Sequence, residues 1–141
     1  YAVAAAPDNI EDALHFARDA LDIVPPSGDL IYRNAFDLLT AQLASAVVVG
    51  KSMIGGVRCD HLAFSGPVVD WQIWIADGDK PLPRKYVIVT RADPAQPEYM
   101  VLMSNWNVAP NLNDAVFRFT PPPGAKKTDF LRLDAGPTSA R

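Results

Sequence analysis

The fold is decided by a short stretch in the middle of the chain, Asp70-Trp71-Gln72-Ile73-Trp74-Ile75-Ala76. Successive side chains of an extended strand point to opposite faces, so Trp71, Ile73 and Ile75 share one face. The opposite face carries a second large aromatic side chain, Trp74. A sheet with one face in water alternates between apolar and polar residues, and this stretch does not. It is therefore predicted to be a strand of an antiparallel sheet that is covered on both faces.

Turn signals recur at short intervals on both sides of this strand. Gly55-Gly56 predicts the turn of a hairpin, and Gly66-Pro67 and Asp77-Gly78-Asp79 predict the connections that flank the strand. Connections this short join antiparallel neighbours, so a β-meander is predicted over residues 46–133. Its strands are expected to pair in sequence order, at residues 46–65 (a hairpin), 69–76, 84–91, 98–107 and 115–120.

The segment before Gly50 has the apolar spacing of helices, and the helical segment is predicted to span residues 8–45. A first helix, within residues 8–24, is expected to bury the face that carries Ile10, Leu14, Ala17 and Leu21. Asp8 or Asn9 caps its start, and Pro25-Pro26 ends it because proline has no backbone donor. A second helix is predicted from Leu30 to Leu43, with a potential break near Asn34.

The composition limits the class of protein. With 141 residues, of which 49% are apolar and 21% charged, the chain suits one hydrophobic core and is neither disordered nor fibrous. We therefore expect a single domain over residues 1–141. A net charge of −3 argues against a nucleic-acid partner, and no apolar run reaches the roughly 18 residues of a membrane span.

Cys59 and His61 have the most evident chemistry. They lie two apart on a predicted strand and so share one face, where they could bind zinc or form a thiol–base pair. A zinc site needs three or four ligands, and the other histidine, His15, lies on the first predicted helix. The sequence contains no nucleophile elbow and no phosphate-binding loop. We interpret Cys59 as a buried thiol and His61 as a hydrogen-bonded side chain, and predict no catalytic residue, metal or cofactor.

The large apolar side chains on both faces of the sheet allow two interpretations. One is ordinary packing on both sides. The other is a hydrophobic cavity between a curved sheet and the helices, with methionines as an adaptable lining. The candidate ligand-binding residues of this second interpretation are Trp71, Trp74, Met100, Met103 and Trp106.

Several motifs resemble those of one known family. They are Ile54-Gly55-Gly56-Val57-Arg58-Cys59-Asp60-His61-Leu62-Ala63-Phe64, Asp70-Trp71-Gln72-Ile73-Trp74-Ile75, Leu82-Pro83-Arg84-Lys85, Ser104-Asn105-Trp106-Asn107 and Phe117-Arg118-Phe119-Thr120-Pro121-Pro122. Over residues 49–130 the chain thereby resembles predicted periplasmic bacterial proteins that share a domain of unknown function, number 2092. The resemblance implies a periplasmic location and the fold of the lipoprotein carrier LolA and its receptor LolB. That fold is an incomplete antiparallel barrel, whose concave face is lidded by helices around a cavity for acyl chains.

On this resemblance the fold class is α+β, a curved antiparallel sheet with two helices packed on its concave face. Family members carry further strands before the helices, so the chain resembles the C-terminal part of such a domain. The apolar stretch Ala46-Val47-Val48-Val49 contains neither charge nor proline, which are devices that protect natural sheet edges. We therefore expect a second copy, or an N-terminal fragment of the same protein, to pair with this edge.

The resulting hypothesis is non-enzymatic binding, in the periplasm, of an acyl chain, a lipid or another hydrophobic ligand, including one carried by a lipidated protein. The alternative is a protein-interaction module that uses an open sheet edge and holds no ligand. A third hypothesis, a hydrolase that uses His61, lacks the nucleophile motif that it would need.

Overall fold

The computed structural model describes residues 1–130. By its internal contacts the chain divides into two compact units, and each is described by itself. Residues 29–108 form the sheet unit. Residues 1–28, together with the segment that begins at Ala109, form the helical unit.

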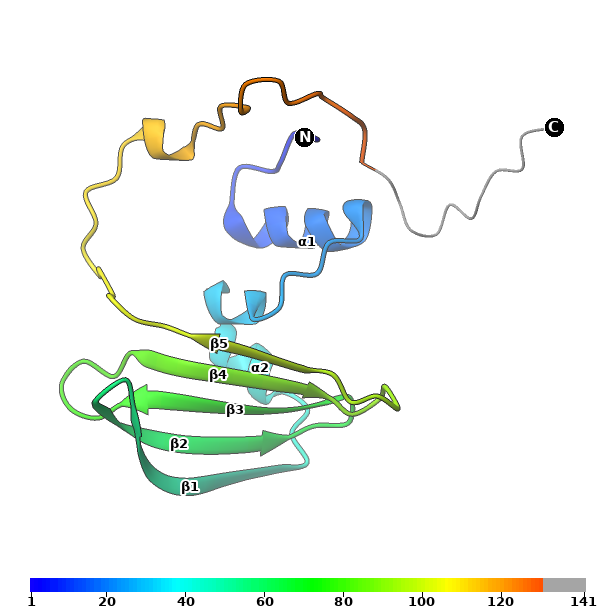
Figure 1. Ribbon diagram of the computed structural model, residues 1–141. Helices are drawn as coiled ribbons and strands as arrows, with labels where there is room; N and C mark the ends of the chain where they lie inside the picture. Colours follow the sequence, from blue (N-terminus) through cyan, green and yellow to red (C-terminus); the bar gives the residue numbers. More distant parts are fainter. Residues whose placement is uncertain (131–141) are drawn as a thin grey trace. The chain divides into compact units, whose positions relative to one another are not determined.

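The sheet unit contains five antiparallel strands that pair in sequence order (Figure 1). They are β1 (Ser45–Ile54), β2 (Val57–Ser65), β3 (Val69–Ala76), β4 (Pro83–Thr90) and β5 (Glu98–Leu102). Gly55 and Gly56, both with positive φ, form the turn between β1 and β2. The predicted hairpin and the predicted order of the strands are thereby confirmed.

Two short helical elements take the place of one helix from Leu30 to Leu43. The 3-10 helix η1 (Gly28–Ile31) comes first, and α2 (Ala35–Thr40) follows after the break that was predicted near Asn34. Leu30, Leu39 and Leu43 pack against the sheet. These three leucines are the apolar cover that this segment gives to one face of the sheet.

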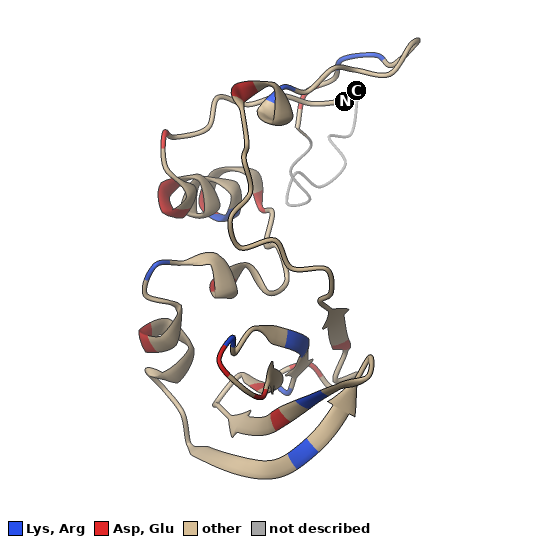
Figure 2. Ribbon diagram, turned by 90° about the vertical axis from the view of Figure 1, so that its left-hand side faces the viewer, with Lys and Arg blue, Asp and Glu red and all other residues tan. Residues whose placement is uncertain are grey.

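β1 is a bent strand. Its register to β2 shifts between Val48 and Gly50, which leaves Val49 unpaired in a β-bulge, and Gly50 has a φ of 138°. A bulge bends a strand and increases its twist. Figure 2 shows β1 curving below the other strands towards the side on which α2 lies. The fold class is therefore α+β with a curved open sheet, as predicted.

The helical unit contains α1 (Ile10–Leu21), which lies within its predicted range. Asn9 caps the helix, because its Oδ1 accepts a hydrogen bond from the backbone N–H of Asp12 at 2.8 Å. The helix ends at Asp22, which adopts a left-handed conformation with φ of 55°. The start agrees with the predicted cap at Asn9, whereas the predicted end at Pro25-Pro26 is wrong, because the left-handed conformation of Asp22 ends the helix first.

The strand predicted at residues 115–120 is wrong. The 3-10 helix η2 (Asp114–Phe117) occupies this place, and its C-cap, Arg118, is followed by chain without regular structure as far as residue 121. Oδ1 of Asn113 accepts a hydrogen bond from the backbone N–H of Ala115 at 3.0 Å, which starts a turn instead of a strand. The prolines at residues 121–123 lack the N–H donors that a strand ladder needs.

The strand predicted at residues 98–107 is shorter than expected and ends at Leu102. Asn105 has a φ of 55°, which lies outside the extended conformation. Within residues 1–130 the meander therefore ends at Leu102, and the end of its predicted range, residues 131–133, lies outside the described residues.

Candidate functional site

One face of the sheet carries an apolar cluster that we call the α2-side cluster. Its buried members are Trp71 and Ile73 of β3 and Tyr86 of β4. The ring of Phe64 stacks on that of Trp71, with 3.8 Å between centroids and 13° between planes. Tyr86 meets Trp71 at a tilt of 60°, with 5.8 Å between centroids. Trp71 is thus the centre of this cluster.

The α2-side cluster is wider than its cover. Seven apolar side chains of the sheet and its ends surround the buried members and stay only partly buried: Leu62, Phe64, Val69, Ile75, Ile88, Val101 and Met103. The cover, Leu30, Leu39 and Leu43, is itself only partly buried. Partly exposed apolar side chains around a buried centre are typical of surfaces that bind a hydrophobic partner or ligand.

Tyr86 contributes a neutral hydroxyl to the α2-side cluster. Its side chain is 1% exposed, and burial raises the pKa of the hydroxyl well above its usual range. The negative charge of Asp29 raises this pKa further. The cluster therefore gains no charge from Tyr86 at physiological pH.

The other face of the sheet carries a second cluster, the opposite-face cluster, whose buried members are Cys59, Trp74 and Val87. His61 and Lys85 are the partners of Trp74 in the neighbouring strands β2 and β4. The imidazole of His61 stacks on the indole at 4.0 Å between centroids, and Nζ of Lys85 lies 4.5 Å from the indole centroid. Trp74 is therefore packed from both neighbouring strands.

Cys59 and His61 share this face, as predicted, and each has a partner. The Sγ of the fully buried Cys59 donates a weak hydrogen bond to the carbonyl oxygen of Val57 at 3.4 Å. Nε2 of His61 lies 2.7 Å from Oε1 of Gln72. Both contacts agree with the interpretation of a buried thiol and a hydrogen-bonded histidine. Within residues 1–130, no three His, Cys, Asp or Glu side chains group as metal ligands would.

The structure separates the five candidate ligand-binding residues. Trp71 and Met103 lie in the α2-side cluster, whereas Trp74 lies in the opposite-face cluster. Met100 pairs with the buried Val87 of the opposite face and is 52% exposed. Trp106 lies beyond β5, where its Nε1 donates a hydrogen bond to the carbonyl oxygen of Pro83 at 2.8 Å. Of the five, the structure brings Trp71 and Met103 together.

Phe64 and Tyr86 belong to the α2-side cluster but were not among the candidates. In the observed register Phe64 lies opposite Trp71, and Tyr86 lies opposite Ile73. Alternation along β2 and β4 would have assigned both to this face once the register was known. The sequence pattern alone does not contain that register, because many alignments of short apolar strands satisfy it.

A charged network lies beside the β1–β2 hairpin. Nζ of Lys51 is 2.7 Å from Oδ1 of Asp60 and 3.2 Å from Oδ2 of Asp77, and Nη2 of Arg58 is 2.9 Å from the same oxygen of Asp77. The hydrogen bond from Lys51, then its charge and the bond from Arg58, hold the pKa of Asp77 below its usual range. The hydrogen bonds to Asp60 and Asp77 raise the pKa of Lys51. Because these side chains are solvent-exposed to a large extent, the network orients the hairpin more than it stabilises the fold.

The fold and the site define a small α+β protein whose open, curved sheet has one incompletely covered apolar face. The sequence model of the family described as "Predicted periplasmic protein (DUF2092)" matches residues 1–131, so the chain belongs to this family. The family and the periplasmic location that the motifs implied are thereby confirmed. No curated protein and no solved structure matches the chain. None of the helices within residues 1–130 is long and apolar enough to cross a membrane.

Proposed function

We propose that the chain binds an acyl chain, or another long hydrophobic ligand, at the α2-side cluster, between the curved sheet and residues 30–43. One observation carries the proposal: seven partly buried apolar side chains around Trp71, Ile73 and Tyr86 face a cover of only three leucines. A ligand with an apolar chain would bury the apolar surface of the sheet that these three leucines leave accessible. Burial of apolar surface contributes about 25 cal/mol per Å².

The chemistry of the α2-side cluster favours an apolar chain over a polar metabolite. Its members are aliphatic and aromatic side chains and one thioether, with a neutral phenol from Tyr86. Such groups make non-directional contacts, and the flexible side chain of Met103 adapts to irregular shapes. The ligand class is therefore the acyl chain of a free lipid or of a lipidated protein.

The proposed role is binding without catalysis. The groups that could act as nucleophile or base, Cys59 and His61, lie on the opposite face, where Val57, Gln72 and Trp74 engage them. A nucleophile needs an accessible position beside a base. Cys59 is fully buried.

The proposal is tested with protein purified without detergent, whose organic extract is analysed by mass spectrometry. We expect acyl lipids in the extract at a substantial molar ratio to protein. The delipidated protein is then titrated with the lipophilic fluorophore N-phenyl-1-naphthylamine, and micromolar affinity is expected. Lipid-free protein that also fails to bind the fluorophore would contradict the proposal.

Two matched pairs of variants locate the site. Met103→Ser and Leu39→Ser alter the α2-side cluster, whereas Met100→Ser and Leu38→Ser change exposed residues of the same types nearby. Met103→Ser and Leu39→Ser should each weaken fluorophore binding by about tenfold, because they remove apolar contact area. Met100→Ser and Leu38→Ser should leave the binding unchanged. Circular dichroism verifies the fold of all four. If Met103→Ser weakens binding no more than Met100→Ser does, and Leu39→Ser no more than Leu38→Ser, the fluorophore binds outside the α2-side cluster.

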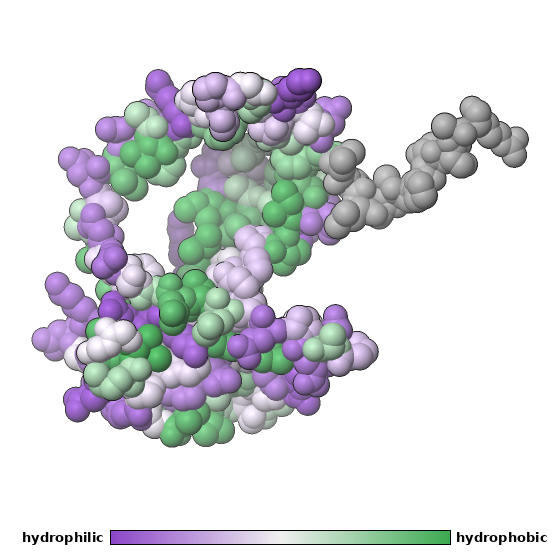
Figure 3. Space-filling view, viewed as in Figure 1, coloured by the Kyte–Doolittle hydropathy of each residue, from purple (hydrophilic) through white to green (hydrophobic). Residues whose placement is uncertain are grey.

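A second candidate function, recruitment of a protein strand, is favoured by the exposed edge of β1. Within the described residues β1 has a neighbour on one side alone, and Val48 on this strand is 72% exposed. Figure 3 shows hydrophobic surface at the β1 end of the sheet unit. The bulge at Val49 is a protective feature of this edge that the sequence pattern did not predict.

Light scattering at micromolar concentration tests this candidate. If the edge pairs with a second copy, the chain is dimeric and Val48→Lys makes it monomeric, because a charge on an edge disfavours pairing. A chain that is monomeric before and after the substitution would eliminate pairing between copies. The matched change Val68→Lys, at an exposed valine in the connection between β2 and β3, controls for added charge.

A further inference from the structure

The helical unit exposes a short apolar surface at and after η2. Val116, Phe117 and Phe119 are all exposed, Phe117 to 75%. Figure 3 shows hydrophobic surface over η2, the short helix that Figure 1 draws in yellow-orange. Two phenylalanines and a valine within four residues are more apolar surface than an ordinary loop presents to water.

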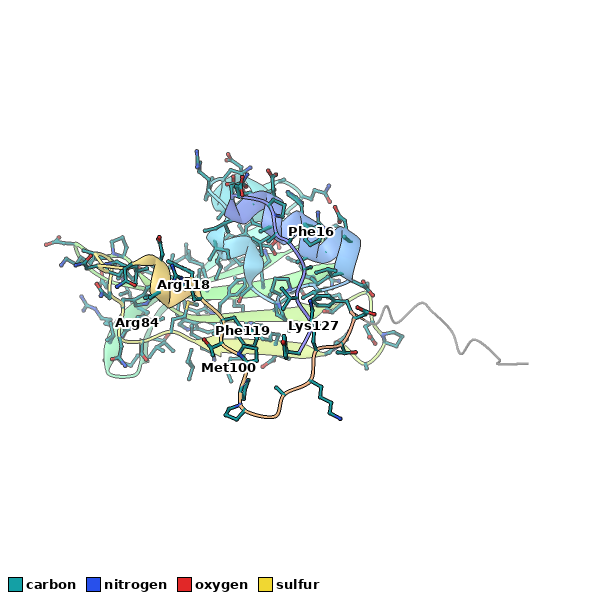
Figure 4. The ribbon with its side chains drawn as sticks, turned by 90° about the horizontal axis from the view of Figure 1, so that it is seen from above. Phe16, Arg84, Met100, Arg118, Phe119 and Lys127 are labelled. Carbon is teal, nitrogen blue, oxygen red and sulfur yellow. The ribbon has the colours of Figure 1, made fainter. Side chains whose placement is uncertain are left out.

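The same segment is locally basic. Residues 115–128 contain Arg118, Lys126 and Lys127 and no acidic residue, whereas the whole chain has a net charge of −3. The flanking acids are Asp114 and Asp129. Figure 4 labels Arg118, Phe119 and Lys127, which follow one another along the segment that leaves η2. Exposed aromatic side chains and cations are thus combined on one stretch of chain.

Backbone hydrogen bonds hold this segment at both ends. At its start, the N–H of Arg118 donates to the carbonyl of Ala115 at 3.3 Å, which closes η2. At its end, the N–H of Thr128 donates to the carbonyl of Tyr1 at 2.9 Å, and the Tyr1 nitrogen donates to the carbonyl of Lys126 at 2.8 Å. These bonds limit the conformations open to the two ends of the segment, which lowers the entropy cost of docking.

The ring of Phe119 is partly engaged, whereas that of Phe117 pairs with no other aromatic ring within residues 1–130. Phe119 meets the ring of Tyr1 with 5.7 Å between centroids and 57° between planes. Phe117 is the more exposed of the two. Phe117 is accordingly the side chain best placed to enter an apolar phase.

We propose that residues 115–128 dock the protein on a membrane surface that contains anionic lipid. Phe117 and Val116 would enter the boundary between headgroups and acyl chains, and Arg118, Lys126 and Lys127 would pair with lipid phosphates. Aromatic and basic groups together match this interface, where one layer is apolar and the next is anionic. A periplasmic protein has such a surface within reach. The inference is independent of the ligand proposed above.

The experiment is co-sedimentation of the full chain with vesicles. One set contains phosphatidylglycerol and phosphatidylethanolamine in roughly equal amounts, and the other contains phosphatidylcholine alone. The protein should sediment with the anionic vesicles, and binding should weaken when salt is raised from about 0.05 M to about 0.5 M, because ions screen exposed charges. Equal binding to both sets, or none to either, would overturn the proposal.

Matched variants distinguish docking through this segment from non-specific adsorption through exposed apolar side chains. Phe117→Ser should weaken binding to anionic vesicles about tenfold, since the apolar contribution of one ring is lost. The control is Phe36→Ser on α2, because Phe36 is 77% exposed but lies beside Asp37, and this change should have no effect. Arg118→Gln, Lys126→Gln and Lys127→Gln should each weaken binding about fivefold at low salt.

Each outcome decides for or against the proposal. Loss of binding in Phe117→Ser with full binding in Phe36→Ser supports docking through residues 115–128. Equal losses in the two variants, or an unchanged affinity in Phe117→Ser, would overturn it. Circular dichroism confirms that both variants are folded, as is expected for changes at exposed side chains.

Discussion

The indole of Trp74 lies nearly parallel to the imidazole of His61, with 4.0 Å between centroids and 13° between planes. Lys85 approaches the same indole from the next strand, with its Nζ 4.5 Å from the centroid. One aromatic ring thus connects β2, β3 and β4 across the opposite face of the sheet. The contact between His61 and Gln72 holds the imidazole in place. This arrangement gives Trp74 a packing role at the centre of that face.

Truncation of Trp74 should therefore be among the most destabilising single changes. Trp74→Ala is expected to lower the free energy of unfolding by about 3–5 kcal/mol, measured by urea denaturation, because a buried ring and its stacking partner are lost. The control is Trp106→Ala, at a residue that is 44% exposed and makes one hydrogen bond to Pro83, with an expected loss of about 1 kcal/mol. Equal losses would refute the packing role of Trp74.

Ser52 on β1 carries a buried hydroxyl that lacks a hydrogen-bond partner among the described residues. A buried polar atom without a partner costs stability, so Ser52→Ala should raise the free energy of unfolding by about 1 kcal/mol. Ser45→Ala on the same strand is the control, because Ser45 is exposed and its replacement should change little. Thermal unfolding of both variants provides the measurement. A loss of stability in Ser52→Ala would show that the hydroxyl is satisfied.

Asp77 makes the stability of the sheet unit sensitive to acid. Lys51, through its hydrogen bond and charge, and then Arg58 lower the pKa of Asp77 below its usual value of 3.8. A lowered pKa contributes stability that is present above the usual value and is lost as pH falls through the lowered one. Between about pH 5 and pH 2, Asp77→Asn should therefore lose less stability than the unaltered chain.

The control for Asp77 is Asp79→Asn in the same turn, which removes the same charge but leaves the contact with Lys51 intact. Its acid sensitivity should equal that of the unaltered chain. High salt should reduce the difference between Asp77→Asn and the unaltered chain, since both partners are accessible to ions. Parallel pH profiles for the two variants would contradict the role assigned to Asp77.

Tyr86 makes stability sensitive to alkali. Burial, and then the charge of Asp29, raise the pKa of its hydroxyl above the usual value of 10.0. A raised pKa contributes stability that is present below the usual value and is lost as pH rises through the raised one. Tyr86→Phe should therefore lose less stability than the unaltered chain between about pH 10 and pH 12. Tyr99→Phe, at an exposed tyrosine of β5, should behave as the unaltered chain does.

The parts of the fold that could be predicted are those with strong local signals. Glycine pairs adopt positive φ without strain, so Gly55-Gly56 predicted its hairpin. Asn9 predicted the start of α1 because its side chain can bond the free donors of the first turn. The alternation in Phe117-Arg118-Phe119 covers only three residues, and the turn that begins at Asn113 overrides it.

The candidate site depended on information that a single strand does not carry. Trp71 and Trp74 are three residues apart, so alternation alone places them on opposite faces, and the structure does the same. Phe64 and Tyr86 lie in the same cluster as Trp71 because of the register of β2, β3 and β4. That register depends on long-range pairing. The sequence pattern did not predict the bulge at Val49. Gly50 is compatible with a bulge, but a glycine at this position is equally compatible with an ordinary turn.

Gly50 is the residue on which the bend of β1 depends. Its φ of 138° is one that L-residues rarely adopt, and no atom lies within 4 Å of where a Cβ would be. The cost of Gly50→Ala is therefore one of backbone conformation alone, and we expect a loss of about 1–2 kcal/mol in urea denaturation. D-alanine at residue 50, introduced by peptide ligation, adds the same methyl group but accepts positive φ, and should preserve the stability. If both changes cost the same, the conformation of Gly50 is not what stabilises the bulge, and the curvature of β1 has another origin.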